Sequence, residues 1–140
     1  MGSIEPAPER IQRFLKQTRS GEPIVMINLL RYAKDAAYAT DSGEAACSGR
    51  EAYGRYAAGV FPLLGKVGAH VVWMGSVAST VISPEGEEWD DAVLMEYPSR
   101  EAFIEMTSSA EYQAISHHRT AALADSRLIA TTPGNPIAEQ

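Results

Sequence analysis

The sequence predicts an α+β fold of the ferredoxin-like kind, with the order β-α-β-β-α-β and one extra helix in front. Three observations favour this fold. Strand-length apolar segments alternate with helical patterns, the helices begin at capping sequences, and the last helix is broken in two. The 140 residues suit a single domain. We expect an N-terminal helix and lead-in at residues 1–22, a ferredoxin-like core at 23–132 and a tail at 133–140.

The leading helix and the first strand are defined by apolar spacing and by residues that end helices. Over residues 8–18 the apolar side chains fall on one helical face, and Gly21 and Pro23 end that helix. Residues 24–30 are short and almost wholly apolar, which predicts a strand covered on both faces. Asn28 interrupts this run, and a buried amide without partners costs about 1–3 kcal/mol.

A long loop and a capped helix follow the first strand. Residues 33–47 are rich in small and polar side chains, and loops of this length are often lids or binding loops. A mobile insertion is the alternative. Ser48 and Glu51 have the capping-box spacing, in which a hydroxyl and a carboxylate satisfy free amides at a helix start. The helix then carries Tyr53 and Tyr56 at apolar positions.

The next two strands are predicted by alternation. Residues 69–81 predict a long strand, with His70 and Val72 on one side and Trp73 on the other. Residues 91–97 predict the strand that follows a turn.

Two short helices and a final strand complete the core. Ser99 begins one helix, residues 108–111 begin another with capping-box spacing, and residues 127–131 form the last strand. Helices of this arrangement cover only one face of a four-stranded sheet, whereas the strands are apolar on both faces. Pairing with a second copy of the chain is the simplest cover for the other face.

Composition and charge narrow the classes of partner. The net charge of −6 and the pI near 5.0 argue against nucleic acid or an anionic membrane. Cys47 is the only cysteine, so no internal disulfide forms, which fits a reducing cytoplasm. No apolar run approaches the ~20 residues that cross a bilayer, and the first residues lack the pattern of a signal peptide. We expect a cytoplasmic protein.

The order of several short motifs resembles the family called domain of unknown function 1330. Residues 28–32 resemble a longer subgroup of that family, and the match spans about residues 24–129. The motifs that carry the resemblance are Tyr53, Tyr56, Gly68, Trp89, Asp90, Tyr97-Pro98-Ser99, Ala102, Phe103, Glu111-Tyr112-Gln113 and Arg119. The leading helix and the loop at 33–47 lie outside the minimal pattern.

The resemblance implies the dimeric α/β-barrel superfamily. There two sheets pack face to face around a cavity that often holds a ligand. Relatives include cofactor-free monooxygenases, isomerases, cyclases and haem-binding enzymes, and the family has no agreed reaction. The resemblance thus implies a fold, a homodimer and a pocket, and it leaves the chemistry open.

Polar side chains set into apolar elements are the candidate ligand-binding residues. Arg31 follows the first strand, and its planar guanidinium suits a carboxylate or enolate, although a surface ion pair is the alternative. Asn28 could hydrogen-bond a ligand carbonyl or tie neighbouring backbone. Tyr53, Tyr56 and Trp73 could line a pocket for a flat ligand or simply belong to the core.

Three further residues are candidates for a pocket or for catalysis. Arg119 lies on a covered helix flank, so we expect a carboxylate partner, either Asp91 or Glu96. Glu96 lies in an apolar strand, where poor solvation would raise its pKa and make it a general base. His118 is the second catalytic candidate, and it and His70 are the histidines most worth testing.

The sequence predicts no metal site and no cofactor. His117 and His118 are adjacent on a helix, so we expect them to point in different directions and not to chelate. Zinc ligand spacing is missing, and Cys47 is expected to be a spectator.

The leading hypothesis is a small-molecule-binding protein or a cofactor-independent enzyme of the monooxygenase, isomerase or cyclase kind, with a pocket between sheet and helices. Whether the chain is an enzyme stays open. A non-catalytic dimeric module is the competing hypothesis, and haem binding through His70 or His118 is a third.

Overall fold

Four strands of the computed structural model form one antiparallel sheet in the order β2-β3-β1-β4, which confirms the predicted ferredoxin-like arrangement. The structure describes residues 2–134 and residue 137, so most of the predicted tail lies outside the described residues. The elements, in chain order, are α1 (Pro8–Gln17), β1 (Ile24–Tyr32), α2 (Gly49–Lys66), β2 (His70–Ser76), β3 (Asp91–Tyr97), α3 (Arg100–Ser108), α4 (Ala110–Ala122) and β4 (Leu123–Thr131).

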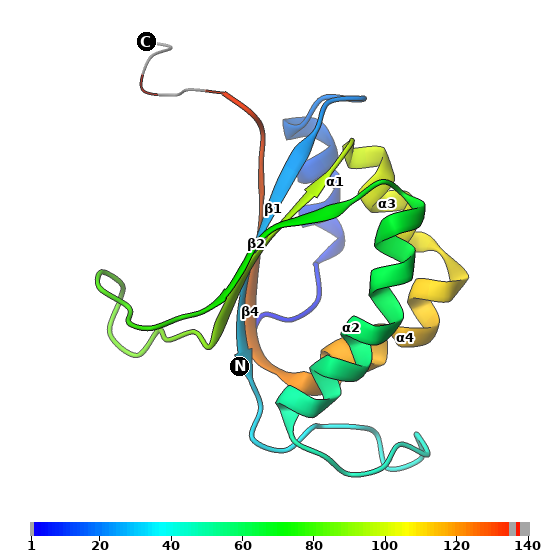
Figure 1. Ribbon diagram of the computed structural model, residues 1–140, viewed down its shortest axis with the longest axis vertical. Coiled ribbons are helices and arrows are strands. Elements are labelled where there is room, and N and C mark those ends of the chain that lie inside the picture. The colour runs from blue at the N-terminus through cyan, green and yellow to red at the C-terminus, as the bar shows by residue number, and fades with distance from the viewer. Residues whose placement is uncertain (1, 135–136, 138–140) are drawn as a thin grey trace.

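The helices α2, α3 and α4 lie on one face of the sheet, and the other face has no helix over it (Figure 1). Ile24 and Leu30 of β1 are fully buried beneath the helices. The helix α1 packs beside α3, where the rings of Phe14 and Phe103 meet edge-on with centroids 5.7 Å apart. Burial of apolar side chains on this face is the main stabilising contribution to the fold.

The strand register assigns alternate residues to the two faces. In β1 and β3, Met26 faces the helices opposite Met95, whereas Ile27 faces away opposite Leu94. The strands are therefore apolar on both faces as predicted, but the helices of one chain cover only one of them. We call the uncovered side the open face. Its side chains are Val25, Ile27, Leu29, Arg31, His70, Trp73, Ala92, Leu94, Glu96, Asp125, Arg127, Ile129 and Thr131.

A β-bulge corrects the predicted alternation of β2. The register shifts between Val71 and Trp73, so Val72 is an extra residue and His70 shares the open face with Trp73. The prediction had put His70 and Trp73 on opposite sides. The strand also ends at Ser76 instead of residue 81, because the chain then leaves the sheet as a long connection.

That connection, residues 77–90, projects from the sheet away from the helices, and we call it the β2–β3 arm (Figure 1). The amide of Val77 donates to the carbonyl of Asp90 at 2.8 Å, which closes the base of the arm.

The predicted helix start at Ser99 is confirmed, and of the two predicted capping boxes one is confirmed and one is wrong. Ser48 accepts from the amide of Glu51 at 3.1 Å, and Glu51 accepts from the amide of Ser48, so the capping box of α2 is present. At α4 the cap is Ser109, which accepts from the amide of Tyr112 at 3.1 Å. The predicted box at residues 108–111 does not form, because Ser108 still belongs to α3.

The loop between β1 and α2 is tied to α4. The amide of Ala36 donates to the carbonyl of Cys47 and that of Ala37 to Ala121, both at 2.9 Å. A Cβ on Gly49 would lie 2.1 Å from the carbonyl oxygen of Ala33, so this junction requires glycine.

The last strand is longer than predicted, beginning at Leu123 instead of residue 127. Among the described residues, the structure has no helix with the length and hydropathy needed to cross a membrane.

Candidate ligand site

The predicted site residues fall in three separate places. The sequence predicted that they share one pocket. In the fold, each strand residue points to one of the two sheet faces, and each helix residue lies on one face of its helix, so the predicted residues are separated. The open face holds Arg31, Trp73 and Glu96; the space between helices and sheet holds Asn28, Tyr53, Tyr56 and Arg119; the side of α4 next to the long loop holds His118.

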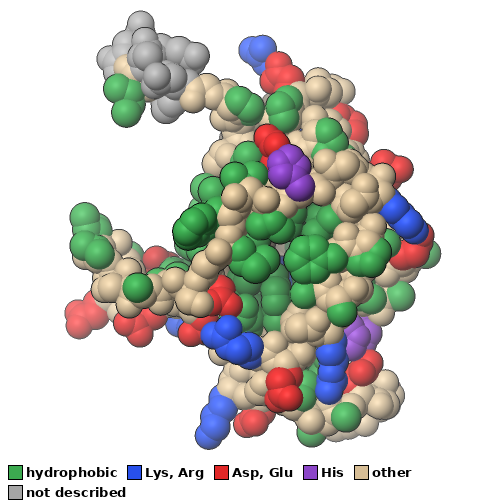
Figure 2. Space-filling view, viewed as in Figure 1, with side chains coloured by type: hydrophobic (Ala, Val, Ile, Leu, Met, Phe, Trp, Pro, Cys, Tyr) green, Lys and Arg blue, Asp and Glu red, His purple; other side chains and the backbone are tan. Residues whose placement is uncertain are grey.

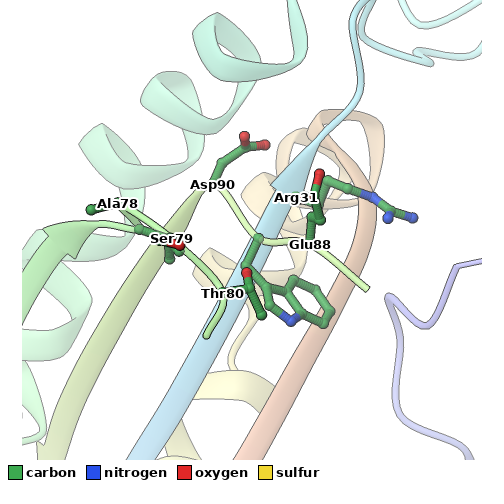
Figure 3. Close-up of a pocket in the computed structure, with 8 residues that line it drawn as sticks. Arg31, Ala78, Ser79, Thr80, Glu88 and Asp90 are labelled. Carbon is green, nitrogen blue, oxygen red and sulfur yellow. The ribbon is translucent and has the colours of Figure 1, made fainter. Parts of the chain in front are cut away.

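A hollow of about 290 Å³ lies at the base of the β2–β3 arm, where the arm meets the end of β1 (Figure 3). This place differs from the predicted pocket between sheet and helices. Arg31 is the one predicted site residue that lines it. The full lining is Arg31, Val77, Ala78, Ser79, Thr80, Glu88, Trp89 and Asp90.

Arg31 presents a guanidinium with unused donors to this hollow. Its side chain is 39% exposed, and the nearest carboxylate oxygen, Oδ2 of Asp125, lies 3.7 Å from Nη2. It makes no hydrogen bond to any residue that the structure describes. A guanidinium offers several N–H donors in one plane, so Arg31 can bind a carboxylate without breaking an existing hydrogen bond.

Asp125 is held in place by other partners. Its Oδ1 accepts from the amides of Ser3 at 2.8 Å and Ser126 at 2.9 Å, and from Arg127 at 2.9 Å. Burial alone would raise the pKa of this carboxyl, but those hydrogen bonds outweigh it and lower the pKa. Asp125 is therefore a charged and fixed neighbour that orients Arg31 from a distance.

Asp90 and Trp89 form fixed walls of the hollow. The amide of Asp90 donates to the carbonyl of Leu30 at 2.8 Å, and its Oδ2 accepts from the amide of Tyr32 at 2.9 Å. Its carboxylate points away from the guanidinium of Arg31 (Figure 3). The guanidinium of Arg127 lies 5.0 Å from the ring centroid of Trp89 and holds that ring by a cation–π contact.

Sequence reasoning identified Trp89 and Asp90 only as motif residues, and it missed the polar Ser79 and Thr80. Ser79 and Thr80 were predicted to belong to the strand at residues 69–81, but in the structure this strand ends at Ser76. The turn residues at 84–87 were the available signal for an earlier strand end.

Glu96 does not have the setting that a general base would require. It faces the open side, its side chain is 35% exposed, and its Oε1 lies 3.0 Å from Nε2 of His70. The expectation of poor solvation is therefore wrong for the single chain, because strand parity turns Glu96 away from the helices. Trp73 lies on the same face and is 62% exposed.

Five tyrosines, which include the buried Tyr97, pack between the helices and the sheet. The hydroxyls of Tyr56 and Tyr112 lie 3.0 Å apart, and the rings of Tyr53 and Tyr56 have centroids 5.3 Å apart. Burial raises the pKa of Tyr53 and Tyr56, so both stay neutral at ordinary pH. The hydroxyl of Tyr32 donates to Asp91 Oδ2 at 2.7 Å. These contacts are those of a packed core in which the hydroxyls of Tyr32, Tyr56 and Tyr112 are hydrogen-bonded.

Arg119 has a backbone partner instead of the expected carboxylate. Its Nη1 donates to the carbonyl of Ile4 at 2.8 Å, which fastens the N-terminal segment to α4. The prediction of a pair with Asp91 or Glu96 is wrong. Asp91 is engaged by Arg50 at 3.1 Å, and Glu96 lies on the opposite face of the sheet.

His118 lies against the long loop. Its Nδ1 is 2.6 Å from the hydroxyl of Tyr38, and its ring centroid lies 4.1 Å from that of His117. The expectation that the two adjacent histidines point apart is wrong, because both rings lean toward the same loop.

Residues 36–132 match the profile of the family described as domain of unknown function (DUF1330). The chain belongs to the DUF1330 family. The match includes most of the loop at 33–47 that the motifs alone placed outside the family pattern. A search of curated proteins finds no match.

Solved structures include a similar chain. The RPA0582 protein of unknown function from Rhodopseudomonas palustris is 39% identical, with a TM-score of 0.87 over 97% of this chain and 100% of that one. Two distant structures are similar in fold alone. A dimeric protein of unknown function with a ferredoxin-like fold, from Bacteroides fragilis, is 11% identical and matches with a TM-score of 0.50 over 82% of this chain and 100% of that one. A hydroxynitrile lyase from Passiflora edulis is 11% identical and matches with a TM-score of 0.55 over 84% and 98%.

Proposed function

We propose that this DUF1330 protein is a homodimer that binds a small organic acid at the base of the β2–β3 arm, with Arg31 holding the carboxylate. One observation supports the ligand above the others. Arg31 lines a hollow of about 290 Å³ while its guanidinium makes no hydrogen bond within the described residues.

The open face supports the dimer. Trp73 is 62% exposed and Ile129 is 48% exposed in the single chain, beside the apolar Ile27 and Leu94. Figure 2 shows the sheet nearly edge-on, with hydrophobic side chains gathered around its near edge in the middle of the view. A contiguous apolar patch of this kind marks a protein interface. A second copy offers the matching surface, and a ferredoxin-like neighbour in the comparisons is described as dimeric.

The chemistry of the hollow favours a modest aromatic or planar acid. Trp89 offers an apolar wall, Ser79 and Thr80 offer hydroxyls, and Arg31 offers positive charge. A guanidinium that binds a carboxylate also stabilises an enolate, so the same site could serve a cofactor-independent reaction at the carbon next to a carbonyl. The hydroxynitrile lyase neighbour supports only the statement that such folds host enzymes.

The non-catalytic dimeric module is the second candidate. The apolar open face supports a dimer without a ligand as well as it supports a ligand-binding dimer, because dimer formation alone explains that surface. Haem binding has no supporting contact. His70 pairs with Glu96 at 3.0 Å, and Nε2 of His118 faces the carboxylate of Glu44 at 4.0 Å.

Native mass spectrometry of freshly purified protein, followed by titration with benzoate, tests the proposal. We expect a dimer, and we expect benzoate to raise the thermal midpoint of the wild type. The Arg31→Gln variant should lose that response. Arg13→Gln, on an exposed position of α1, is the matched charge control and should keep it.

A dimer that neither carries extra mass nor responds to benzoate or other small acids would leave the non-catalytic module as the function. A response that survives in Arg31→Gln would remove the proposed site while leaving the dimer intact.

A further inference from the structure

A second cluster of chemical groups shares no residue with the hollow at Arg31. It joins Glu44 of the long loop to His117 and His118 of α4. Glu44 Oε2 lies 3.1 Å from Nε2 of His117 and 4.0 Å from Nε2 of His118. One ligand atom from each of the three residues lies within 4.8 Å of the other two. Three groups that bind metal ions therefore converge on one point.

The fold brings these groups together through the loop. Adjacent helix residues are about 100° apart around the axis. The imidazoles of His117 and His118 therefore meet at one point only if a third group lies between them. Glu44 is that group, because the loop returns alongside α4 and is tied to it by the hydrogen bond from Ala37 to Ala121 (Figure 1). The loop is thus fixed at a distance from α4 that a carboxylate can bridge.

Outer contacts orient the ligands. Arg55 Nη1 lies 3.8 Å from Oε1 of Glu44, which leaves Oε2 for the histidines. Arg55 also donates to the Tyr38 hydroxyl at 3.3 Å, and that hydroxyl lies 2.6 Å from Nδ1 of His118. When the Tyr38 oxygen accepts from Nδ1–H, the free electron pair of His118 is on Nε2, facing Glu44. Such fixing of the imidazole tautomer by an outer partner is typical of metal-binding histidines.

We propose that Glu44, His117 and His118 bind one divalent transition-metal ion per chain, with zinc the best match to two imidazoles and one carboxylate. Tetrahedral zinc with bonds of about 2.0–2.1 Å sets its ligand atoms roughly 3.4 Å apart. The separations of 3.1 and 4.0 Å lie on either side of that value, so small side-chain rotations complete the site.

The site leaves room for a further ligand. His117 and Tyr38 line a hollow of about 320 Å³ together with Ser42, Ser116 and Thr120. Three protein ligands and an open position are the arrangement of catalytic zinc, in contrast to the closed set of four in structural sites. The bound ion would thus present a coordinated water to this hollow, and it would fasten the loop at 33–47 to α4.

Zinc titration of metal-free protein without a polyhistidine tag tests the proposal, by calorimetry and by the absorption spectrum of bound cobalt. We expect one ion per chain in the wild type. His117→Gln and His118→Gln should each weaken zinc binding by more than about 100-fold, because even an outer contact contributes about 10–100-fold. Tyr38→Phe should weaken it by about 10–100-fold.

The chain contains a matched control, because His70 is its only other histidine. His70→Gln should bind zinc as the wild type does. Circular dichroism of each variant checks that the fold is kept, and imidazole NMR resonances of the wild type report which two histidines respond. Wild-type protein that binds no zinc, or the double variant of His117 and His118 binding as tightly as wild type, would overturn the proposal. The benzoate response at Arg31 is independent of either result.

Discussion

The two faces of the sheet are built from the same kinds of residue and have different environments. On the helix side, Ile24 and Leu30 are fully buried. On the open side, Trp73 and Ile129 remain about half exposed or more, at 62% and 48%. The comparison shows that apolar character along a strand does not decide what covers it. Cover depends on where the connecting helices go, and in this topology they all lie on one side.

The largest effect should come from the helix side. Leu30→Ala removes a fully buried side chain, and we expect a loss of about 2–5 kcal/mol in the free energy of unfolding. Urea denaturation measures it. The loss should not depend on protein concentration, because the cavity lies inside one chain.

Ile129→Ala on the open face is the counterpart. If the dimer uses this face, the loss for Ile129→Ala should grow with protein concentration, since the contact is made only in the dimer. Equal behaviour of the two variants across concentrations would mean that the faces do not differ in the way proposed.

The next effect concerns assembly. Trp73→Lys places a charge on the open face, on the edge strand β2, and we expect the dimer to weaken by about 2–4 kcal/mol, the range for an aromatic interface anchor. Light scattering over a dilution series measures the change. Phe61→Lys is the control, because Phe61 is 47% exposed but belongs to α2 on the helix side. A Trp73→Lys variant that stays as dimeric as Phe61→Lys would contradict the assembly through the open face.

The smallest effect tests how α1 is attached to the helix side. Hydrogen bonds from Arg100 and from the amide of Gly21 lower the pKa of Glu101 to about 2. A carboxyl whose pKa is lower in the folded state stabilises the fold above its unfolded pKa, near 4.5, and loses that contribution as the pH falls toward 2. The urea midpoint of the wild type should therefore decrease over this interval, and Glu101→Gln should decrease less.

Glu105→Gln, at an exposed position of the same helix, is the control for this pH dependence. If Glu105→Gln flattens the pH profile as much as Glu101→Gln does, the contact to Gly21 is not the cause.

Local elements were predicted well from the sequence. The strand at residues 91–97 was predicted with its observed bounds, and the Ser48–Glu51 capping box is present. These features depend on neighbouring residues, whose spacing is visible in the chain. The bulge at Val72 was missed, since a bulge changes the pairing with β3 without leaving a mark in the alternation of residues.

The candidate sites depended more on tertiary structure. Arg31 was correctly noted as a strand-end arginine beside a loop, but its neighbours in the hollow come from an arm more than forty residues later. Glu96 was predicted to be poorly solvated because its neighbours in sequence are apolar. Its position in the alternation of β3 places its side chain on the open face instead. The convergence of Glu44 on two adjacent histidines could not be foreseen, because helix geometry alone predicts that they diverge.

The sequence by itself determined the order of elements, most of the caps and the apolar character of both sheet faces, because these are set by residues close together in the chain. Tertiary structure alone decided which face the helices cover, which strand residue points to which face, and which distant side chains meet. Those outcomes depend on register and on the path of the loops, and a local pattern of residues does not encode either one.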